Sequence, residues 1–258
     1  MHPLQVQIYR PSGLLIWDHI HPPFTKKIPI ASLLVVSQRL NQELSNEELC
    51  GNSLSHCIIP TVACAVLTTR AEVEIGKLLS HHLLERFVEI FGDELKSHED
   101  VPALDLSLYS RFSSELPFCL LMCCQTVVSD ILRRERSVSY VLCAYRRTAA
   151  NNYSILCSNK RSADVDDVDE VALLASIAPA VQVERRLYEQ LKLRDQKEPV
   201  ITLTIANPTL KQPSLSLYTC GRLSLVVKHA KQTPPKDILA LTVPTLHALS
   251  DLYDAYKE

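Results

Sequence analysis

The chain has 258 residues, 47% of them hydrophobic, and its 27 basic and 29 acidic residues leave a formal net charge of −2. A chain of this length forms one large domain or two small ones and can build a full hydrophobic core. Charge so close to zero gives no indication of binding to nucleic acid or to a membrane surface. The five glycines are spread along the sequence, which argues against a phosphate-binding P-loop and against a Rossmann fingerprint.

Nine cysteines occur in a chain whose first residues, MHPLQVQIYR, do not have the pattern of a secretory signal. Most of the cysteines lie within apolar segments, where a thiol behaves as a small hydrophobic group. We therefore expect reduced cysteines and a reducing compartment, the cytosol or the nucleus, and of these we predict a cytoplasmic protein.

The spacing of apolar residues predicts a strand-rich first part with two helices. In chain order the expected elements are a strand at 4–9, a strand at 14–19, a helix at 30–44, a strand at 57–69, a helix at 71–95 and a short strand within 103–112. A break of the strand at 57–69 at Pro60 stays open. The polar residues 96–102, KSHEDVP, are predicted to link two domains. The predicted domain bounds are 1–97 and 103–258.

The segment Ser113–Arg136 is predicted to form a helix that is apolar around almost its whole circumference. Such a helix is buried on more than one side, between a sheet and a partner or between two domains. The apolar run before Gln125 is too short to span a membrane. The candidate partner-binding residues are on this helix: Phe118, Leu121, Met122, Val128 and Leu132.

The rest of the chain predicts a second sheet with helices. The expected elements are strands at 138–145 and 153–158, a helix at 168–194 with a kink at Pro179, strands at 200–205, 215–219 and 223–227, and a closing helix at 237–256.

No catalytic or metal-binding motif is evident, and we expect no catalytic residue, no cofactor and no metal. Cys119 and Cys123 lie on one helix face and lack the paired spacing of a zinc site. Cys57 follows a histidine, but no third orienting group can be identified, and a thiol in an apolar strand is usually inert. The acidic run 164–170 lacks the spacing of a calcium loop and suits the start of a helix.

The order of these elements resembles two related folds. The first part resembles a longin domain with one strand missing or unrecognised, and the second resembles the roadblock fold. The resemblance is carried by the opening hairpin LQVQIYRPSGLLIWDH, by VSYVLCAY followed by YSILCS, and by SLSLYTCGRLSLVVKH. GLLIW at the turn into the second strand also resembles longin-type platform proteins of trafficking complexes, such as the Fuzzy and Hermansky–Pudlak syndrome group. The expected fold class is α+β, with two small antiparallel sheets each covered by helices, longin-like followed by roadblock-like.

The resemblance implies a platform that pairs with related subunits and binds small GTPases, coats or tethers. We accordingly expect a non-catalytic interaction subunit of a multiprotein complex in membrane trafficking or small-GTPase regulation. Its partners would be other protein subunits, among them longin or roadblock proteins or a small GTPase, with no direct nucleic acid binding and membrane association only through partners. Two alternatives stay open: a subunit of a nuclear complex, for example in DNA repair, and a hydrolase that uses a Cys or His nucleophile.

Overall fold

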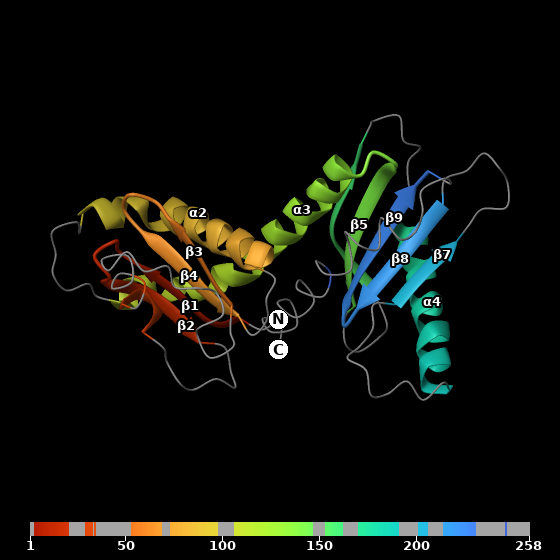
Figure 1. The fold of residues 1–258 in the computed structure, drawn as a ribbon, viewed down its shortest axis with the longest axis horizontal. Helices are drawn as coiled ribbons and strands as arrows, with labels where there is room; N and C mark the ends of the chain where they lie inside the picture. Colours follow the sequence, from red (N-terminus) through yellow and green to blue (C-terminus); the bar gives the residue numbers. More distant parts are fainter. Residues whose placement is uncertain are drawn as a thin grey trace. The chain divides into compact units, whose positions relative to one another are not determined.

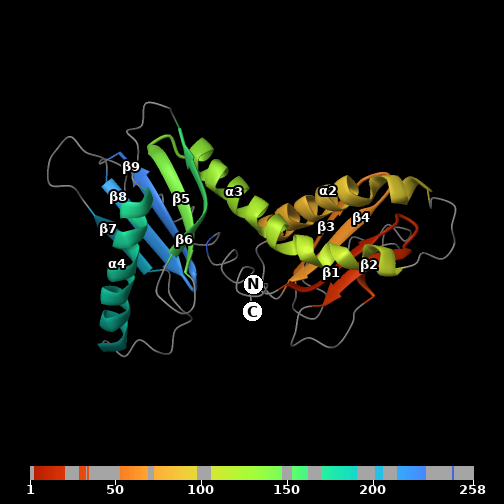
Figure 2. The same cartoon turned by 180° about the vertical axis from the view of Figure 1, so that it is seen from behind.

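The computed structural model describes residues 3–20, 29–32, 34, 53–68, 73–97, 106–146, 153–161, 170–190, 201–205, 214–230 and 246. They form two compact units, and the chain passes from the first to the second between Cys123 and Cys124, inside helix α3. Each unit contains one antiparallel sheet with helices against it (Figures 1 and 2). The predicted α+β fold class is therefore confirmed. Most residues of the predicted linker, the acidic loop, the closing helix and the helix at 30–44 lie outside the described residues, and the first two residues of the predicted linker, Lys96 and Ser97, end helix α2.

The first unit contains a four-stranded sheet in the order β2-β1-β4-β3. Its strands are β1 (Pro3–Tyr9), β2 (Leu15–Ile20), β3 (Ser53–Ile58) and β4 (Ala63–Thr68). The predicted opening hairpin is confirmed, and Gly13 supplies the positive φ of 92° that its turn requires. The strand predicted at 57–69 is interrupted at Pro60, the break that the sequence left open. Pro60, which cannot donate to a ladder, lies in the turn of a hairpin, where Ile59 N–H donates to the Val62 carbonyl at 3.0 Å.

The two faces of this sheet are covered by different helices. One face packs against the helical residues near Ile30 through a buried cluster: Tyr9, Ile30, Ala31, Leu34, Leu54, Ala63, Ala65 and Leu67. Gln7 on β1 accepts a hydrogen bond from Ala31 N–H at 2.9 Å and so satisfies a backbone donor of that helix. Helix α2 (Val73–Ser97) contacts β3 and β4. Because register pairs Ile8 with both Trp17 and Cys64, these side chains share one face of the sheet.

Residues 106–115 form the 3₁₀ helix η1 (Leu106–Glu115), so the short strand predicted within 103–112 is wrong. Tyr109 and Phe112 are three residues apart, and one 3₁₀ turn places such residues on the same side. Both are fully buried, and Phe112 lies 4.9 Å from Phe87 and 5.1 Å from Trp17, measured between ring centres. This aromatic cluster holds η1 against α2 and β2. Burial of the two rings favours the 3₁₀ helix over the strand that the alternating pattern of LDLSLY predicts.

The second unit contains a five-stranded sheet in the order β6-β5-β9-β8-β7. Its strands are β5 (Val138–Arg146), β6 (Tyr153–Lys160), β7 (Ile201–Ile205), β8 (Ser214–Cys220) and β9 (Leu223–His229). All five confirm the predictions. Helix α4 (Glu170–Gln190) contains Pro179. Its residues Ile177 and Val181 are buried with side chains of the sheet, among them Leu142 and Val226.

The two sheets follow one strand order. In the first sheet the hairpin β1–β2 places β1 beside β4, the last strand of the hairpin β3–β4. In the second sheet the hairpin β5–β6 places β5 beside β9, the last strand of the hairpin β8–β9. All of these pairs are antiparallel. In the second unit β7 extends this arrangement by one strand next to β8. Among the described residues the first sheet has four strands. This agrees with a longin-like unit that lacks a recognised strand, followed by a roadblock-like unit.

Candidate interaction surface

Helix α3 (Leu116–Arg134) contributes to both units. Its buried residues are Leu116, Cys119, Leu120, Cys123, Cys124, Val127, Val128, Ile131 and Leu132. With about 3.6 residues per turn, the buried face of the half after Cys123 is offset by roughly a quarter turn from that of the half before it. The helix is therefore buried on more than one side, as predicted. It is not apolar all the way round, because Gln125, Thr126 and Ser129 face away from the core.

On helix α3 the large apolar side chains that reach the surface lie on one turn, formed by Phe118, Leu121 and Met122. We call these three residues the α3 apolar turn. Phe118 is 43% exposed, and Leu121 and Met122 are half-buried. Residues spaced by three and four positions lie side by side on a helix, so the three side chains form one patch. Clustered exposed apolar side chains are typical of interaction sites, whereas single ones are common on any surface.

The five predicted partner-binding residues therefore have different positions. Phe118, Leu121 and Met122 reach the surface together. Val128 is 1% exposed and Leu132 is 6% exposed, and both are part of the protein's own core. A direct contact with a partner stays a prediction for the first three, whereas burial removes Val128 and Leu132 from the candidate surface.

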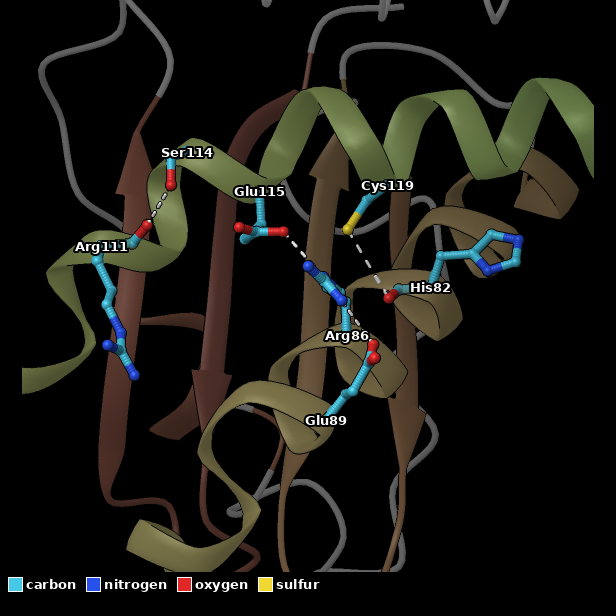
Figure 3. A network of polar contacts seen from close by, with 7 residues as sticks. All are labelled: His82, Arg86, Glu89, Arg111, Ser114, Glu115 and Cys119. Carbon is cyan, nitrogen blue, oxygen red and sulfur yellow. Dashed lines mark hydrogen bonds and ion pairs between the residues drawn. The ribbon is translucent and has the colours of Figure 1, made fainter. Parts of the chain in front are cut away.

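Arg86 on α2 fixes Phe118 in place. Its guanidinium carbon lies 4.8 Å from the centre of the Phe118 ring, within the range of a cation–π contact. The same guanidinium donates to Glu115 Oε2 at 2.8 Å and to Glu89 Oε2 at 2.7 Å. Figure 3 shows Arg86 between these two carboxylates, one from α2 and one from the residue just before α3. Arg86, Glu89 and Glu115 therefore border the α3 apolar turn on its α2 side, and we call these three residues the charged frame.

The side of this turn that faces the protein interior is fully buried at Cys119. Cys119 is fully buried, and its thiol donates to the His82 carbonyl at 3.8 Å (Figure 3). Burial raises the pKa of Cys119 to about 12, so the thiol stays protonated and unreactive at neutral pH. Cys119 is thus a core residue, which leaves partner contact to the outer side chains.

The structure brings together one constellation that sequence reasoning missed. Cys57 Sγ lies 3.9 Å from His81 Nδ1, and His81 Nε2 lies 3.1 Å from Glu85 Oε1. The order cysteine, histidine, carboxylate is that of an activated nucleophile. Burial and the Glu85 charge raise the pKa of Cys57, however, so the thiol is not poised as a thiolate. The only local signal was the i, i+4 spacing of His81 and Glu85, which gives no indication of Cys57.

Two further features of the described residues bear on function. They include no group of three His, Cys, Asp or Glu side chains able to hold a metal ion. One helical stretch, Ser107–Arg134, is long and apolar enough to cross a membrane by length and composition, with a mean hydropathy of 1.5. Half of its most apolar window is buried inside the protein, and core helices pass the same test.

Comparison with known proteins finds likeness at the level of fold. No protein-family model matches the chain, and no curated protein matches it. The chain is similar to the gliding protein MglB from Thermus thermophilus, with 14% identity over 50% of this chain and 87% of that one and a TM-score of 0.39. It is also similar to a structure of MglB with tetrameric arrangement, with 14% identity, 53% and 92% coverage and a TM-score of 0.41.

Proposed function

We propose that the protein is a non-catalytic interaction subunit of a cytoplasmic multiprotein complex, and that the α3 apolar turn contacts a protein partner. The observation that carries the proposal is the exposure of Phe118 beside Leu121 and Met122, on a helix whose other large apolar residues are buried. An aromatic side chain held in one orientation loses little entropy on binding, which suits it as an anchor.

The charged frame supports a protein partner over a lipid surface. Glu89 and Glu115 flank Arg86 next to Phe118, so the local formal charge is negative, and an anionic membrane surface would be repelled. A protein surface with an apolar pocket and a basic rim fits this patch. Apolar centres with polar rims are the usual anatomy of protein interfaces.

The finer proposal is a role in membrane trafficking or small-GTPase regulation. It is supported by the resemblance to longin- and roadblock-type platforms and by the succession of two such sheets along the chain. The arrangement of Cys57, His81 and Glu85 favours the hydrolase alternative. The raised pKa of Cys57 argues against it, because a nucleophilic cysteine needs a thiolate. Nothing in the described residues favours the nuclear alternative.

The proposal is tested by comparing two exposed apolar positions. Phe118→Asp removes the anchor of the apolar turn, and Val183→Asp makes the same change at a 61% exposed position on α4. Each tagged chain is purified from cells of the source organism, and co-purifying proteins are quantified by mass spectrometry. We expect Phe118→Asp to reduce a stoichiometric partner by roughly tenfold or more, as for an interface hot spot, and Val183→Asp to retain it.

The outcomes separate the two levels of the proposal. Equal recovery of every partner with both variants would show that the apolar turn is not a contact surface. If the lost partner is a small GTPase or another longin- or roadblock-type chain, the finer proposal is supported. If it belongs to neither class, the finer proposal fails while the role as an interaction subunit stands.

A further inference from the structure

Two cysteines face each other across the β5–β6 hairpin. Register pairs Cys143 on β5 with Cys157 on β6, immediately before a bulge at which Ala144 pairs with Ile155. Directly opposed residues of an antiparallel pair point to the same face with their Cβ atoms about 4.5–5.5 Å apart. A disulfide joins Cβ atoms about 3.5–4.5 Å apart, so the two ranges meet at about 4.5 Å. The hairpin therefore holds two thiols in a position to react with each other.

A third thiol, that of Cys124 on α3, adjoins this pair. Hydrogen bonding with the thiols of Cys124 and Cys157, together with complete burial, raises the pKa of Cys143, so this residue keeps its proton. Its hydrogen bond lowers the pKa of Cys157, because an S–H donor stabilises the neighbouring thiolate.

Access differs between the members of the group. Cys143 has no exposed surface and Cys124 is 1% exposed, whereas Cys157 is 8% exposed on β6, an edge strand of the sheet. A small oxidant therefore meets Cys157 first, at the sulfur with the greater thiolate character. Susceptibility to oxidation follows these two properties.

The first unit provides an internal comparison. Cys57 and Cys64 are also paired in register, on β3 and β4. There, burial raises the pKa of both thiols, and the more exposed Cys57 is further opposed by the Glu85 charge. A pair of cysteines in a hairpin is thus not enough, and the β5–β6 pair differs in having one thiol favoured as a thiolate.

We propose that Cys157 and Cys143 are a modification site, at which hydroperoxides convert the two thiols into a disulfide across the β5–β6 hairpin. The proposal does not depend on the role of the α3 apolar turn.

The reaction balances in two steps. The Cys157 sulfur attacks one oxygen of hydrogen peroxide and the O–O bond breaks, which gives a sulfenic acid on Cys157 and one water. The Cys143 sulfur then attacks the Cys157 sulfur, the S–O bond breaks, and the hydroxyl leaves as a second water with the Cys143 proton. The two thiols lose two electrons and two protons in total, and the peroxide gains them.

Tryptic peptides make the test direct. Cleavage at arginine and lysine places Cys143 alone in residues 137–146, Cys157 alone in 148–160 and Cys220 alone in 212–222. The purified full chain is reduced, exposed to hydrogen peroxide, quenched with N-ethylmaleimide and mapped without reduction. We expect a linked pair of the first two peptides. We also expect the unmodified Cys157 peptide to disappear at least roughly tenfold faster than that of Cys220, which is 5% exposed on β8.

Variants separate the pair from ordinary core thiols. Cys157→Ser should abolish the linked peptide and leave Cys143 unoxidised at the same dose, whereas Cys220→Ser should leave both rates unchanged. Circular dichroism establishes that each variant is folded, and the wild-type map remains decisive if one is not. Oxidation of Cys157 no faster than Cys220, or a disulfide at Cys57–Cys64 in preference to Cys143–Cys157, would overturn the proposal.

Discussion

Gly76 on α2 lies so close to Ser55 on β3 that a Cβ atom at position 76 would be 2.4 Å from Ser55 Oγ. Gly92, on the same helix, has room, because its Cβ would be 3.8 Å from Val88 Cγ1. We predict that Gly76→Ala lowers the free energy of unfolding by about 1–3 kcal/mol through overpacking. Gly92→Ala should raise it by about 0.5–1 kcal/mol, since alanine favours a helix.

Chemical denaturation of the two variants and the wild type measures both effects. Adding Ser55→Gly to Gly76→Ala should recover most of the loss, because it removes the atoms that collide. If both alanine variants stabilise the protein, α2 does not approach β3 this closely.

Arg161 closes the C-terminal end of α3. Its guanidinium donates to the carbonyls of Leu132 and of Glu135, the latter at 2.8 Å, and to that of Val138 at 2.9 Å. Carbonyls at a helix end have no partners within the helix. We predict that Arg161→Ala lowers the free energy of unfolding by about 1–2 kcal/mol, measured by thermal or chemical unfolding.

Two further variants test whether the shape of the guanidinium matters. Lys160→Ala, one residue earlier on exposed surface, should change stability by less than about 0.5 kcal/mol. Arg161→Lys should restore only part of the loss, since an ammonium group cannot serve separate carbonyls as a planar fork does. If Arg161→Lys is as stable as the wild type, Arg161 contributes through its charge and not through the shape of its guanidinium group.

Glu135, in the turn after α3, is expected to make the free energy of unfolding depend on pH in the acidic range. Its carboxylate accepts from Ser137 Oγ at 2.6 Å and from Ser137 N–H at 3.2 Å, and these hydrogen bonds lower the pKa of Glu135. A carboxyl group whose pKa is depressed on folding adds stability above its unfolded pKa, and this stability is lost as pH falls through the folded value. Wild type should therefore lose more stability than Ser137→Ala when pH falls below about 4.5.

Urea denaturation between neutral pH and the acidic range measures this difference. At neutral pH Ser137→Ala should be the less stable chain, and the gap should narrow as pH falls. A gap that stays constant would mean that the Ser137 hydroxyl does not favour the ionised form of Glu135.

Glu170 joins the start of α4 to the second sheet. One of its oxygens accepts from Tyr140 Oη at 2.6 Å and from Ser158 Oγ at 2.7 Å. We predict that Glu170→Ala lowers the free energy of unfolding by about 1–3 kcal/mol, the range for hydrogen bonds to a charged group. Tyr140→Phe should cost less, because Ser158 still serves the carboxylate. In a double-mutant cycle the effects of the two substitutions should not be additive.

The two sheets could be predicted from the sequence because hairpins have strong local signals. Alternation in 4–9 and 14–19, with a glycine at the turn, was enough to predict β1 and β2. A break at Pro60 was left open by the sequence, but the pairing of β3 with β4 was not predicted, because CIIPTVACAVLTT is one continuous apolar run. The register of Cys57 with Cys64 shows that its two parts pair. The 3₁₀ helix was missed because its aromatic residues are held by tertiary contacts.

The candidate site was only partly predictable for a similar reason. Composition indicated that Ser113–Arg136 is exceptional, and three of the five residues predicted to bind a partner, Phe118, Leu121 and Met122, reach the surface. No pattern could indicate that Val128 and Leu132 are enclosed, because the buried face turns along the helix where the chain enters its second unit. The contact of Arg86 with Phe118 joins residues 32 positions apart, beyond any local signal.

Because helix α3 belongs to both units, the chain is not easily cut into two stable fragments. A truncation product ending at residue 97 would lose Tyr109 and Phe112 and expose the rings of Trp17 and Phe87. One starting at Leu116 would carry Cys119 and Leu120 with nothing of the first sheet to cover them. Proteolysis or deletion at either of these points should thus yield polypeptides that aggregate and are degraded quickly.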